Sequence, residues 1–411
     1  MKFFHLADLH FGKNIHGYSM IEMGDQRFWI DRVLEKALEL KPDAIVIAGD
    51  VYDRAVPSKE AVQLLDEFLT KIAVLDIPVL MIAGNHDSGS RLAFADKLLC
   101  HQKVYIAGEA CKEVKCITLQ DQYGPVHFWL IPYIFPAMIN VLLEREDIKD
   151  YDSAMRALLE AQSINFQERN VVISHQFIVA GAEKPAMGGS ETTVGGIGQI
   201  DASVFQQFDY AALGHIHNAQ KMGNENIRYA GSPLCYHFSE TGQNKGLTVV
   251  EIKEKGECVV SVVPIPVLHK MLELCGTMEE LLAAKVEKNS YVRAVIKQEV
   301  LPPQAVEQLR KHFSEQNAIL MEVVRAYENK KSSMLENKTK NVRTSSLEEL
   351  FEDFYSYLHE GEFPETHLKK LISFVAEQTR NSTGDESMQE KKQDVKQLIE
   401  YAANCKKEEN E

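Results

Sequence analysis

Short apolar runs alternate with longer amphipathic segments in the amino-terminal part of the chain. The continuous apolar runs at 44–48 and 78–83 are typical of strands covered on both faces, which need no polar alternation. Residues 25–40 and 58–73 instead repeat apolar side chains every three or four positions, which predicts helices. Strands that alternate with helices of this length predict a layered α/β fold.

Each predicted helix has an apolar stripe that should face a sheet. In residues 25–40 the predicted stripe consists of Phe28, Val33, Ala37 and Leu40. In residues 58–73, which Ser58 can cap, it consists of Val62, Leu65, Phe68, Leu69 and Ile72.

The middle of the chain is richer in strands. Besides a first strand at 2–8, near the amino terminus, the pattern predicts five strands in this region and a helix near 152–162. The five strands are at 127–131, 171–173, 210–213, 227–230 and 247–252. The last two strands are expected to belong to the second sheet of a sandwich. Residues 181–198 form a glycine-rich loop, which either contacts substrate or is an ordinary surface loop.

The pattern changes near Pro264 and Pro266, so residues 1–265 are predicted to be one domain. Residues 266–328 read as a small α+β module with helices at 278–286 and 302–313 and strands at 291–296 and 318–326. A polar linker at 329–344 precedes amphipathic helices within 345–380 and a charged tail at 381–411. The first of these helices has an apolar face of Leu350, Phe351, Phe354 and Leu358, which binds a partner or packs on its own domain.

Composition narrows the class of protein. The 411 residues are 45% hydrophobic and 26% charged, which suits a soluble protein with one large core and accessory modules. The net charge of −15 argues against broad electrostatic binding of nucleic acid, but metal-site carboxylates contribute to it and local binding stays open. An early polar amino terminus and the absence of any apolar run near ~18 residues predict a cytoplasmic protein. The seven cysteines, without a CxxC pair, are expected to be reduced, and the P-loop motif of ATPases is absent.

Five predicted strand ends carry the residues with chemical potential. They are Asp8 and His10; Asp50 and Asp53; Asn85, His86 and Asp87; His175; and His215 and His217. Residues two apart on an extended chain point the same way, so a D-x-H or H-x-H pair can reach one ion or two adjacent ions. Imidazole, carboxylate and amide ligands without thiolate favour manganese-like or iron-like ions. One such residue alone is more often a hydrogen-bonded turn or core residue, but five strand ends together predict a metal centre.

The runs FHLADLHFGK, IAGDVYDR, IAGNHDS, FDYAALGHIH and RYAGSPLCYHFSE resemble the calcineurin-like metallophosphoesterase superfamily. Within it they are most similar to the SbcD family, the nuclease subunits of bacterial SbcCD complexes. The resemblance covers residues 1–265 densely and the later module only by architecture. It implies a four-layer α/β/β/α sandwich, a small α+β capping domain and C-terminal helices.

The same resemblance implies roles for individual residues. One ion would be bound by Asp8, His10, Asp50 and His217, and the other by Asp50, Asn85, His175 and His215. His86 would be a non-ligand histidine that faces the scissile phosphate.

Asp53 stands where archaeal and eukaryotic relatives usually have a histidine. We expect its carboxylate to accept a hydrogen bond from His86 and to assist catalysis through it. The alternatives are that Asp53 pairs with Arg54 or caps the helix at Ser58.

The function implied is a two-metal, manganese-dependent DNA nuclease. The family resemblance adds 3′–5′ exonuclease and hairpin or single-strand endonuclease activity, in the processing of DNA breaks and hairpins near the nucleoid. It also implies three partners, namely DNA, a second copy of the chain, and an SbcC-like SMC-family ATPase bound by the C-terminal helices. The alternatives are a phosphatase or small-molecule phosphodiesterase of the same superfamily, and a non-catalytic scaffold for the ATPase. The module after Pro266 and the helices beyond it favour the nuclease, because a minimal phosphatase needs neither.

Overall fold

The fold was obtained from a computed structural model, which describes residues 1–189, 198–298 and 302–326. The chain divides into two compact units, Met1–Ala326 and Tyr327–Glu411, and the described residues all belong to the first. The predicted linker at 329–344, the helices at 345–380 and the tail at 381–411 lie outside the described residues.

The first sheet has six strands, of which four are parallel and two antiparallel. Its order is β16 (Cys258–Pro264), β15 (Gly246–Ile252), β1 (Lys2–Leu6), β4 (Ala44–Ala48), β5 (Val79–Ile82) and β6 (Val104–Ala107). β1, β4, β5 and β6 run parallel, while β15 is antiparallel to β1 and β16 to β15. The carboxyl ends of β1, β4 and β5 therefore meet at one edge.

The second sheet also has six strands with a parallel centre. Its order is β13 (Gln220–Met222), β14 (Asn224–Tyr229), β12 (Tyr210–Gly214), β9 (Arg169–His175), β8 (Gly124–Ile131) and β7 (Lys115–Asp121). β14, β12, β9 and β8 are parallel, and the edge strands β13 and β7 are antiparallel to their neighbours.

One expectation about these sheets is wrong. The strand predicted at 247–252 forms as β15, but it pairs with β1 in the first sheet, whereas the strand predicted at 227–230 lies in the second sheet as part of β14. Both segments are apolar, and apolarity identifies a strand without identifying the sheet to which it belongs.

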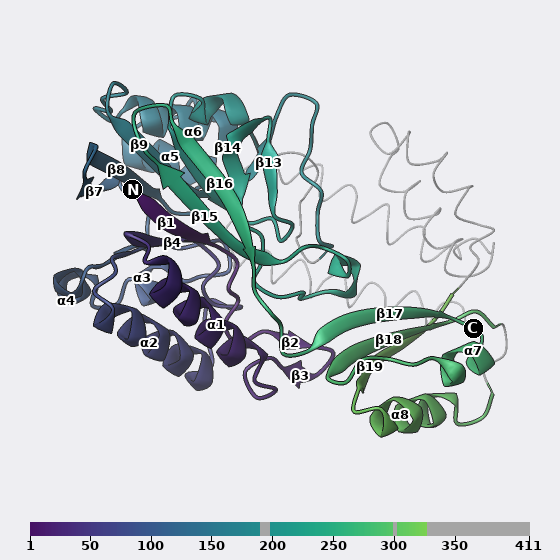
Figure 1. Cartoon of the computed structure of the whole chain (residues 1–411). Helices are drawn as coiled ribbons and strands as arrows, with labels where there is room; N and C mark the ends of the chain where they lie inside the picture. Colours follow the sequence, from purple (N-terminus) through teal and green to yellow (C-terminus); the bar gives the residue numbers. More distant parts are fainter. Residues whose placement is uncertain (190–197, 299–301, 327–411) are drawn as a thin grey trace, which may run out of the picture. The chain divides into compact units, whose positions relative to one another are not determined.

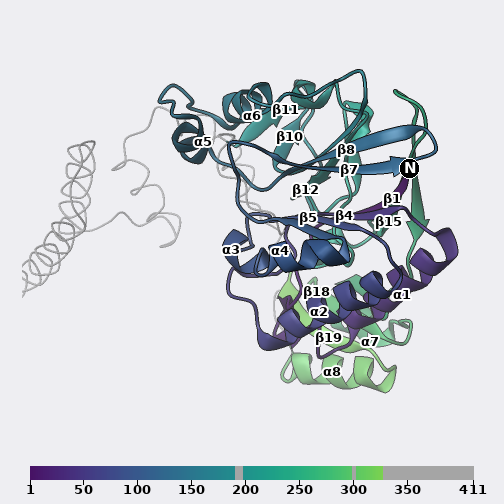
Figure 2. The same ribbon diagram turned by 90° about the vertical axis from the view of Figure 1, so that its left-hand side faces the viewer.

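Two helical layers enclose the two sheets. Figure 2 shows α5 (Pro136–Leu143) and α6 (Tyr151–Glu160) beyond the second sheet, and α1 (Asp25–Leu40) and α2 (Lys59–Val74) beyond the first. Alternate residues of β1 and β4 pack in opposite directions, Phe4 and Ile45 toward the helices and Phe3 and Val46 toward the other sheet. The expected four-layer α/β/β/α sandwich is confirmed.

The core between the sheets is held by large side chains from both. The ring of Phe3 on β1 lies 5.5 Å from that of Phe128 on β8 and 5.8 Å from that of Tyr210 on β12, both edge to face. Aromatic pairs with this geometry add about 0.5–1.5 kcal/mol to the burial of their area. The two sheets are thereby fixed against each other below the edge at which their strands end.

The helices begin and end close to the predicted residues, but their buried stripes differ. α2 is capped by the Ser58 side chain, which accepts a hydrogen bond from the Ala61 amide. Val62 is 46% exposed and Phe28 is only half-buried beneath Arg32. The stripes that face the sheet are Trp29, Ile30, Val33 and Ala37 in α1, and Ala61, Leu64, Leu65, Phe68 and Ile72 in α2.

A small parallel sheet follows the sandwich. Figure 1 shows β17 (Lys270–Gly276), β18 (Ser290–Ile296) and β19 (Ile319–Arg325) beside α7 (Met278–Ala283) and α8 (Ala305–Glu315). All three strands are parallel, so the strand β17, which the sequence did not predict, completes a β–α–β–α–β unit. The Asp25 carboxylate of α1 accepts a hydrogen bond from the Tyr291 hydroxyl at 2.6 Å and lies 3.0 Å from Nδ1 of His269. These bonds join the small sheet to the sandwich, and the division of the chain at residue 266 stays a prediction.

The other elements are short. They are β2 (Asn14–Ile15), β3 (Tyr18–Ser19), α3 (Gly89–Leu92), α4 (Asp96–Leu99), η1 (Cys100–Gln102), β10 (Phe177–Val179), β11 (Gln199–Asp201), η2 (Ala202–Phe205) and η3 (Phe238–Glu240). Among the described residues, every helix is too short or too polar to cross a bilayer.

Candidate metal centre

The predicted site residues follow the carboxyl ends of neighbouring parallel strands. Asp8 and His10 come after β1, Asp50 after β4, and Asn85 and His86 after β5. From the second sheet, His175 ends β9, and His215 and His217 follow β12. Open α/β sheets commonly place their ligands at this edge.

Four of these residues have unusual backbone conformations. The φ angles of Asp8, His10, Asp50 and His215 are 54°, 44°, 49° and 101°. Left-handed conformations of non-glycine residues cost free energy, and they concentrate at functional sites, where the surrounding structure holds them. Their coincidence with the predicted ligands supports a functional role for this edge.

Two glycines let the strand ends approach each other. A Cβ atom on Gly214 would lie 1.9 Å from the Ala48 carbonyl oxygen, and one on Gly49 would lie 2.4 Å from Nδ1 of His175. Gly49 also has a φ of 85°, which favours glycine. The two sheets can therefore bring their polar residues together only because these positions have no side chain.

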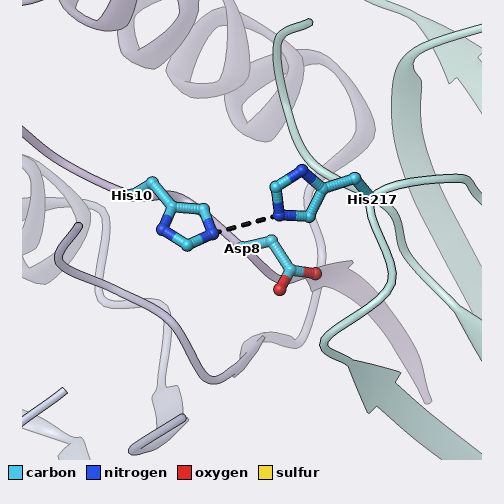
Figure 3. Close-up of side chains that lie close together, drawn as sticks. All are labelled: Asp8, His10 and His217. Carbon is cyan, nitrogen blue, oxygen red and sulfur yellow. Dashed lines mark hydrogen bonds between the residues drawn. The ribbon is translucent and has the colours of Figure 1, made fainter. Parts of the chain in front are cut away.

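A first cluster consists of Asp8, His10 and His217, which are all buried. Each contributes a possible ligand atom, and the three atoms lie within 4.8 Å of one another. Figure 3 shows the rings of His10 and His217 facing each other, with their Nε2 atoms 3.1 Å apart, and Asp8 beside them.

A second cluster is centred on His175. Its Nε2 atom lies 3.2 Å from Oδ2 of Asp50 and 3.1 Å from Oδ1 of Asn85. The same Asn85 oxygen is 3.1 Å from Nδ1 of His215. One carboxylate, one amide oxygen and two imidazoles thus surround one small volume.

Asp50 lies between the two clusters. The Oδ2 atom that contacts His175 is also 3.7 Å from Nε2 of His10. The structure therefore brings all seven residues predicted as ligands together, with Asp50 in contact with His10 of the first cluster and His175 of the second.

The histidine tautomers suit metal binding. Nδ1 of His175 donates to the Ala48 carbonyl at 2.8 Å, and Nδ1 of His217 donates to the Glu240 carboxylate at 3.0 Å. Since carbonyl and carboxylate oxygens can only accept, each Nδ1 carries a proton and each Nε2 is directed inward as a possible ligand. Hydrogen bonds of this kind orient most metal-binding histidines, so the donor set fits a divalent cation.

Burial and neighbouring charges shift the pKa values of the buried groups in the site. Burial, assisted by the Asp50 charge, raises the pKa of Asp8 to about 6. Burial opposes the charge of Asp50, but His175, His10 and His86 outweigh it and hold the pKa of Asp50 well below its usual range. Burial likewise opposes the charge of His175, but Asp50 outweighs it and raises the pKa of His175 to about 9. A cation that binds Nε2 of His175 must therefore displace a proton.

The hydrogen bond between His86 and Asp53 involves a different atom of Asp53 from the one expected. Nδ1 of His86 donates to the backbone carbonyl of Asp53 at 2.9 Å, not to its carboxylate. The carboxylate instead accepts from Nζ of Lys13 at 2.8 Å and lies 3.7 Å from Arg54 and 3.6 Å from Nδ1 of His10. The turn after β4 thus presents its main chain to His86, and the expected carboxylate dyad is wrong.

Two carboxylates support the site in ways that the sequence did not predict: Asp87, which stands among the predicted strand-end residues, and Glu240. Asp87 accepts from the amides of Val51, Tyr52 and Gly84 at 2.9–3.1 Å, so it fixes the turns that follow β4 and β5. Glu240 is buried and bonds to His217, and its pKa falls to about 2 because His217 and Lys245 outweigh the effect of burial. Both residues stand in runs that carry the family resemblance, IAGNHDS and RYAGSPLCYHFSE, and that position was the available signal.

Sequence profiles of two known families match parts of this chain. The sequence profile of calcineurin-like phosphoesterases matches residues 1–219, a range that includes all seven predicted ligands. The profile of the type 5 capsule protein repressor C-terminal domain matches residues 267–357. The chain is 32% identical over 301 residues to the D subunit of the nuclease SbcCD of Staphylococcus epidermidis, which covers 71% of this chain and 77% of that protein. Among solved structures, TT1561 of Thermus thermophilus is similar with a TM-score of 0.35 and 10% identity, over 64% of this chain and 98% of that one.

Proposed function

The chain belongs to the calcineurin-like phosphoesterase family and, within it, to the SbcD nucleases, and from this premise we propose that it is a two-metal DNA nuclease. It acts as a 3′–5′ exonuclease and as an endonuclease on hairpins and single strands. The observation that carries the proposal is the Asp50 carboxylate, which lies within 3.7 Å of ligand nitrogens from both clusters. One carboxylate between two ligand sets is the arrangement of enzymes that cleave phosphodiesters with a pair of ions.

Manganese is the ion we propose for both positions. Asp8, His10, Asp50 and His217 would hold one ion, and Asp50, Asn85, His175 and His215 the other. Mixed nitrogen and oxygen donors without a thiolate suit Mn²⁺. Two bound ions of this kind supply positive charge for the phosphate and lower the pKa of water.

His86 has the geometry of a proton donor. Its Nδ1 proton is committed to the Asp53 carbonyl, and its ring lies edge to face with that of His10, 4.8 Å between centroids. This leaves Nε2 of a half-buried ring beside the ligand cluster. In the doubly protonated ring Nε2 also carries a proton, and in that form we assign His86 the stabilisation of the phosphate in the transition state and the donation of the Nε2 proton to the leaving oxygen.

Cations at the rim of the site supply local attraction for DNA. Arg54, whose side chain is 78% exposed, follows Asp53 on the turn after β4. The exposed Arg91 of α3 donates to the Ala55 carbonyl at 2.8 Å and so lies against the same turn. Arginines here can contact phosphates although the chain as a whole is acidic.

The test is a cleavage assay with purified full-length chain. Hairpin DNA and linear duplexes labelled at either end are incubated with Mn²⁺, alone and with the ATPase partner, and single-nucleotide products released from the 3′ end are expected. A matched assay uses p-nitrophenyl phosphate, a monoester that a phosphatase would hydrolyse. Efficient monoester hydrolysis without DNA cleavage would contradict the nuclease proposal and favour a phosphatase.

The partner we propose is an SbcC-like SMC-family ATPase, bound in the cytoplasm at the nucleoid. The apolar face of Leu350, Phe351, Phe354 and Leu358, which lies outside the described residues, would bury itself against that partner's coiled coil. Phe351→Glu with Phe354→Glu is expected to abolish co-elution with the ATPase in size-exclusion chromatography, while Mn²⁺-dependent cleavage of small phosphodiesters persists. Loss of both properties would instead place the helix in the chain's own core.

A second copy of the chain is also proposed as a partner. Phe94 and Leu98 carry large apolar side chains that are 81% and 72% exposed, and they lie close together in and before α4. Closed two-fold pairs are the commonest oligomers, and such pairs bury apolar surface of this kind. Light scattering in the same chromatography gives the molar mass of the chain alone, which should be that of a dimer.

A further inference from the structure

Glu240 is a buried carboxylate with a structured set of partners. It ends η3, and its side chain is 0% exposed. Its Oε1 atom lies 3.0 Å from Nδ1 of His217, whereas Oε2 accepts from Nζ of Lys245 at 2.8 Å and from the Tyr236 amide at 3.2 Å. One carboxylate oxygen therefore binds the predicted metal ligand His217, and the other binds Lys245 and the main chain of Tyr236.

Lys245 also holds the same histidine, through its main chain. Besides Glu240, its ammonium group donates to the backbone carbonyl of His217 at 2.8 Å and to Oγ of Ser232 at 2.7 Å. The side chain and the main chain of His217 are thus held by one ion pair whose members are both almost completely buried. A buried pair with this number of hydrogen bonds defines a single geometry.

The orientation of the other inward-facing histidine does not depend on Glu240. His175 donates Nδ1–H to the Ala48 carbonyl, a main-chain atom of β4. Removing the Glu240 charge should consequently affect the cluster of Asp8, His10 and His217 and leave the cluster around His175 intact.

We propose that Glu240 is a positioning residue that holds His217 with Nε2 directed at one of the two metal ions and increases the basicity of that ligand. The inference rests on the proposed two-metal function and assigns a residue that acts only on the ion shared by Asp8, His10 and His217. Carboxylates that hydrogen-bond a ligand histidine commonly change metal affinity by about 10- to 100-fold.

The test is a calorimetric titration of the metal-free full chain with Mn²⁺. Wild type should bind two ions. Glu240→Gln keeps the size of the side chain but removes its charge, and it should weaken one ion by about 10- to 100-fold while the affinity of the other stays unchanged. Glu225→Gln is the matched control, because Glu225 is 63% exposed and its described ion pairs are with Lys221 and Arg228, away from the ligands.

A double-mutant cycle separates positioning from a general loss of structure. If Glu240 acts through His217, then Glu240→Gln should add nothing to the loss of affinity caused by His217→Ala. Additive losses, or equal weakening of both ions, would overturn the proposal. If Glu240→Gln alone lowers the melting temperature so far that it cannot be titrated, the pair Glu240→Gln with Lys245→Met removes both charges together and is titrated instead. If the wild-type chain does not bind two ions, the two-metal function itself is contradicted. If wild type binds two ions and Glu240→Gln binds both with unchanged affinity, only the role of Glu240 is contradicted.

Discussion

Asp50→Ala is expected to disturb both metal positions and to lower Mn²⁺-dependent DNA cleavage by about a thousandfold or more, because both ions stabilise the reacting oxygens. The Asp50 carboxylate lies within 4 Å of His10 on one side and of His175 on the other. Without it, His10 and His175 both lose contact with the negatively charged carboxylate that lies between them. The measurement is the number of manganese ions retained per chain after dialysis, together with single-turnover cleavage of linear DNA.

Asn85→Ala provides the contrast within the site. The Asn85 amide oxygen contacts His175 and His215 at 3.1 Å, both in the second cluster. Its loss should weaken one ion and leave the other in place. Asp31→Ala, which removes an exposed carboxylate paired with Lys71 on the helical face, is the control for loss of an aspartate and should retain both ions. Equal manganese retention by wild type and Asp50→Ala would sink the assignment of Asp50 as the shared ligand.

The sequence predicts that these residues lie together because each of them follows or ends a strand. Apolar runs such as 44–48 identify buried strands, and parallel strands necessarily deliver their next residues to one edge. What such a pattern cannot state is how close the two sheets come. That depends on the van der Waals contact of Gly49 and Gly214 with the opposite strand ends.

Residues that support the ligands were harder to predict. Glu240 is in a short 3₁₀ turn, 23 residues from His217, and no local periodicity relates the two positions. Asp87 contacts backbone amides, whose positions depend on the turns around them. Hydrogen bonds between a side chain and distant main chain are set by the tertiary structure, so composition and spacing leave them open. The same reason explains why the prediction of the sheet for β15 is wrong. β15 pairs with β1, and the two strands are separated in the sequence by most of the sandwich domain.

The largest change between the sequence-based hypothesis and the structure concerns Asp53. A carboxylate that fixed His86 would make the two residues one functional unit. In the structure the hydrogen-bond partner of His86 is the backbone carbonyl of Asp53. A substitution at position 53 keeps this carbonyl as long as it does not distort the turn. The Asp53 carboxylate instead serves Lys13 and the neighbourhood of His10.

The expected kinetics follow from this separation. His86→Ala should lower turnover by about 10²- to 10⁴-fold, the usual contribution of a positioned proton donor, with two manganese ions still bound. Asp53→Asn keeps the carbonyl that orients His86 and loses the ion pair with Lys13, so a smaller loss of about fivefold is expected, which corresponds to the ~1 kcal/mol upper end of what a partly exposed ion pair contributes. Lys13→Met should reproduce that loss, since it removes the other member of the same pair.

The double variant His86→Ala with Asp53→Asn distinguishes the two mechanisms. Because the two side chains act on different partners, their losses in single-turnover cleavage at saturating Mn²⁺ should multiply. A double variant no slower than His86→Ala alone would mean that Asp53 works only through His86, and the carboxylate dyad would have to form when substrate binds. Metal content measured on every variant separates either result from a loss of ions, because His10 lies 3.6 Å from the Asp53 carboxylate and a drop in bound manganese would place the effect there instead.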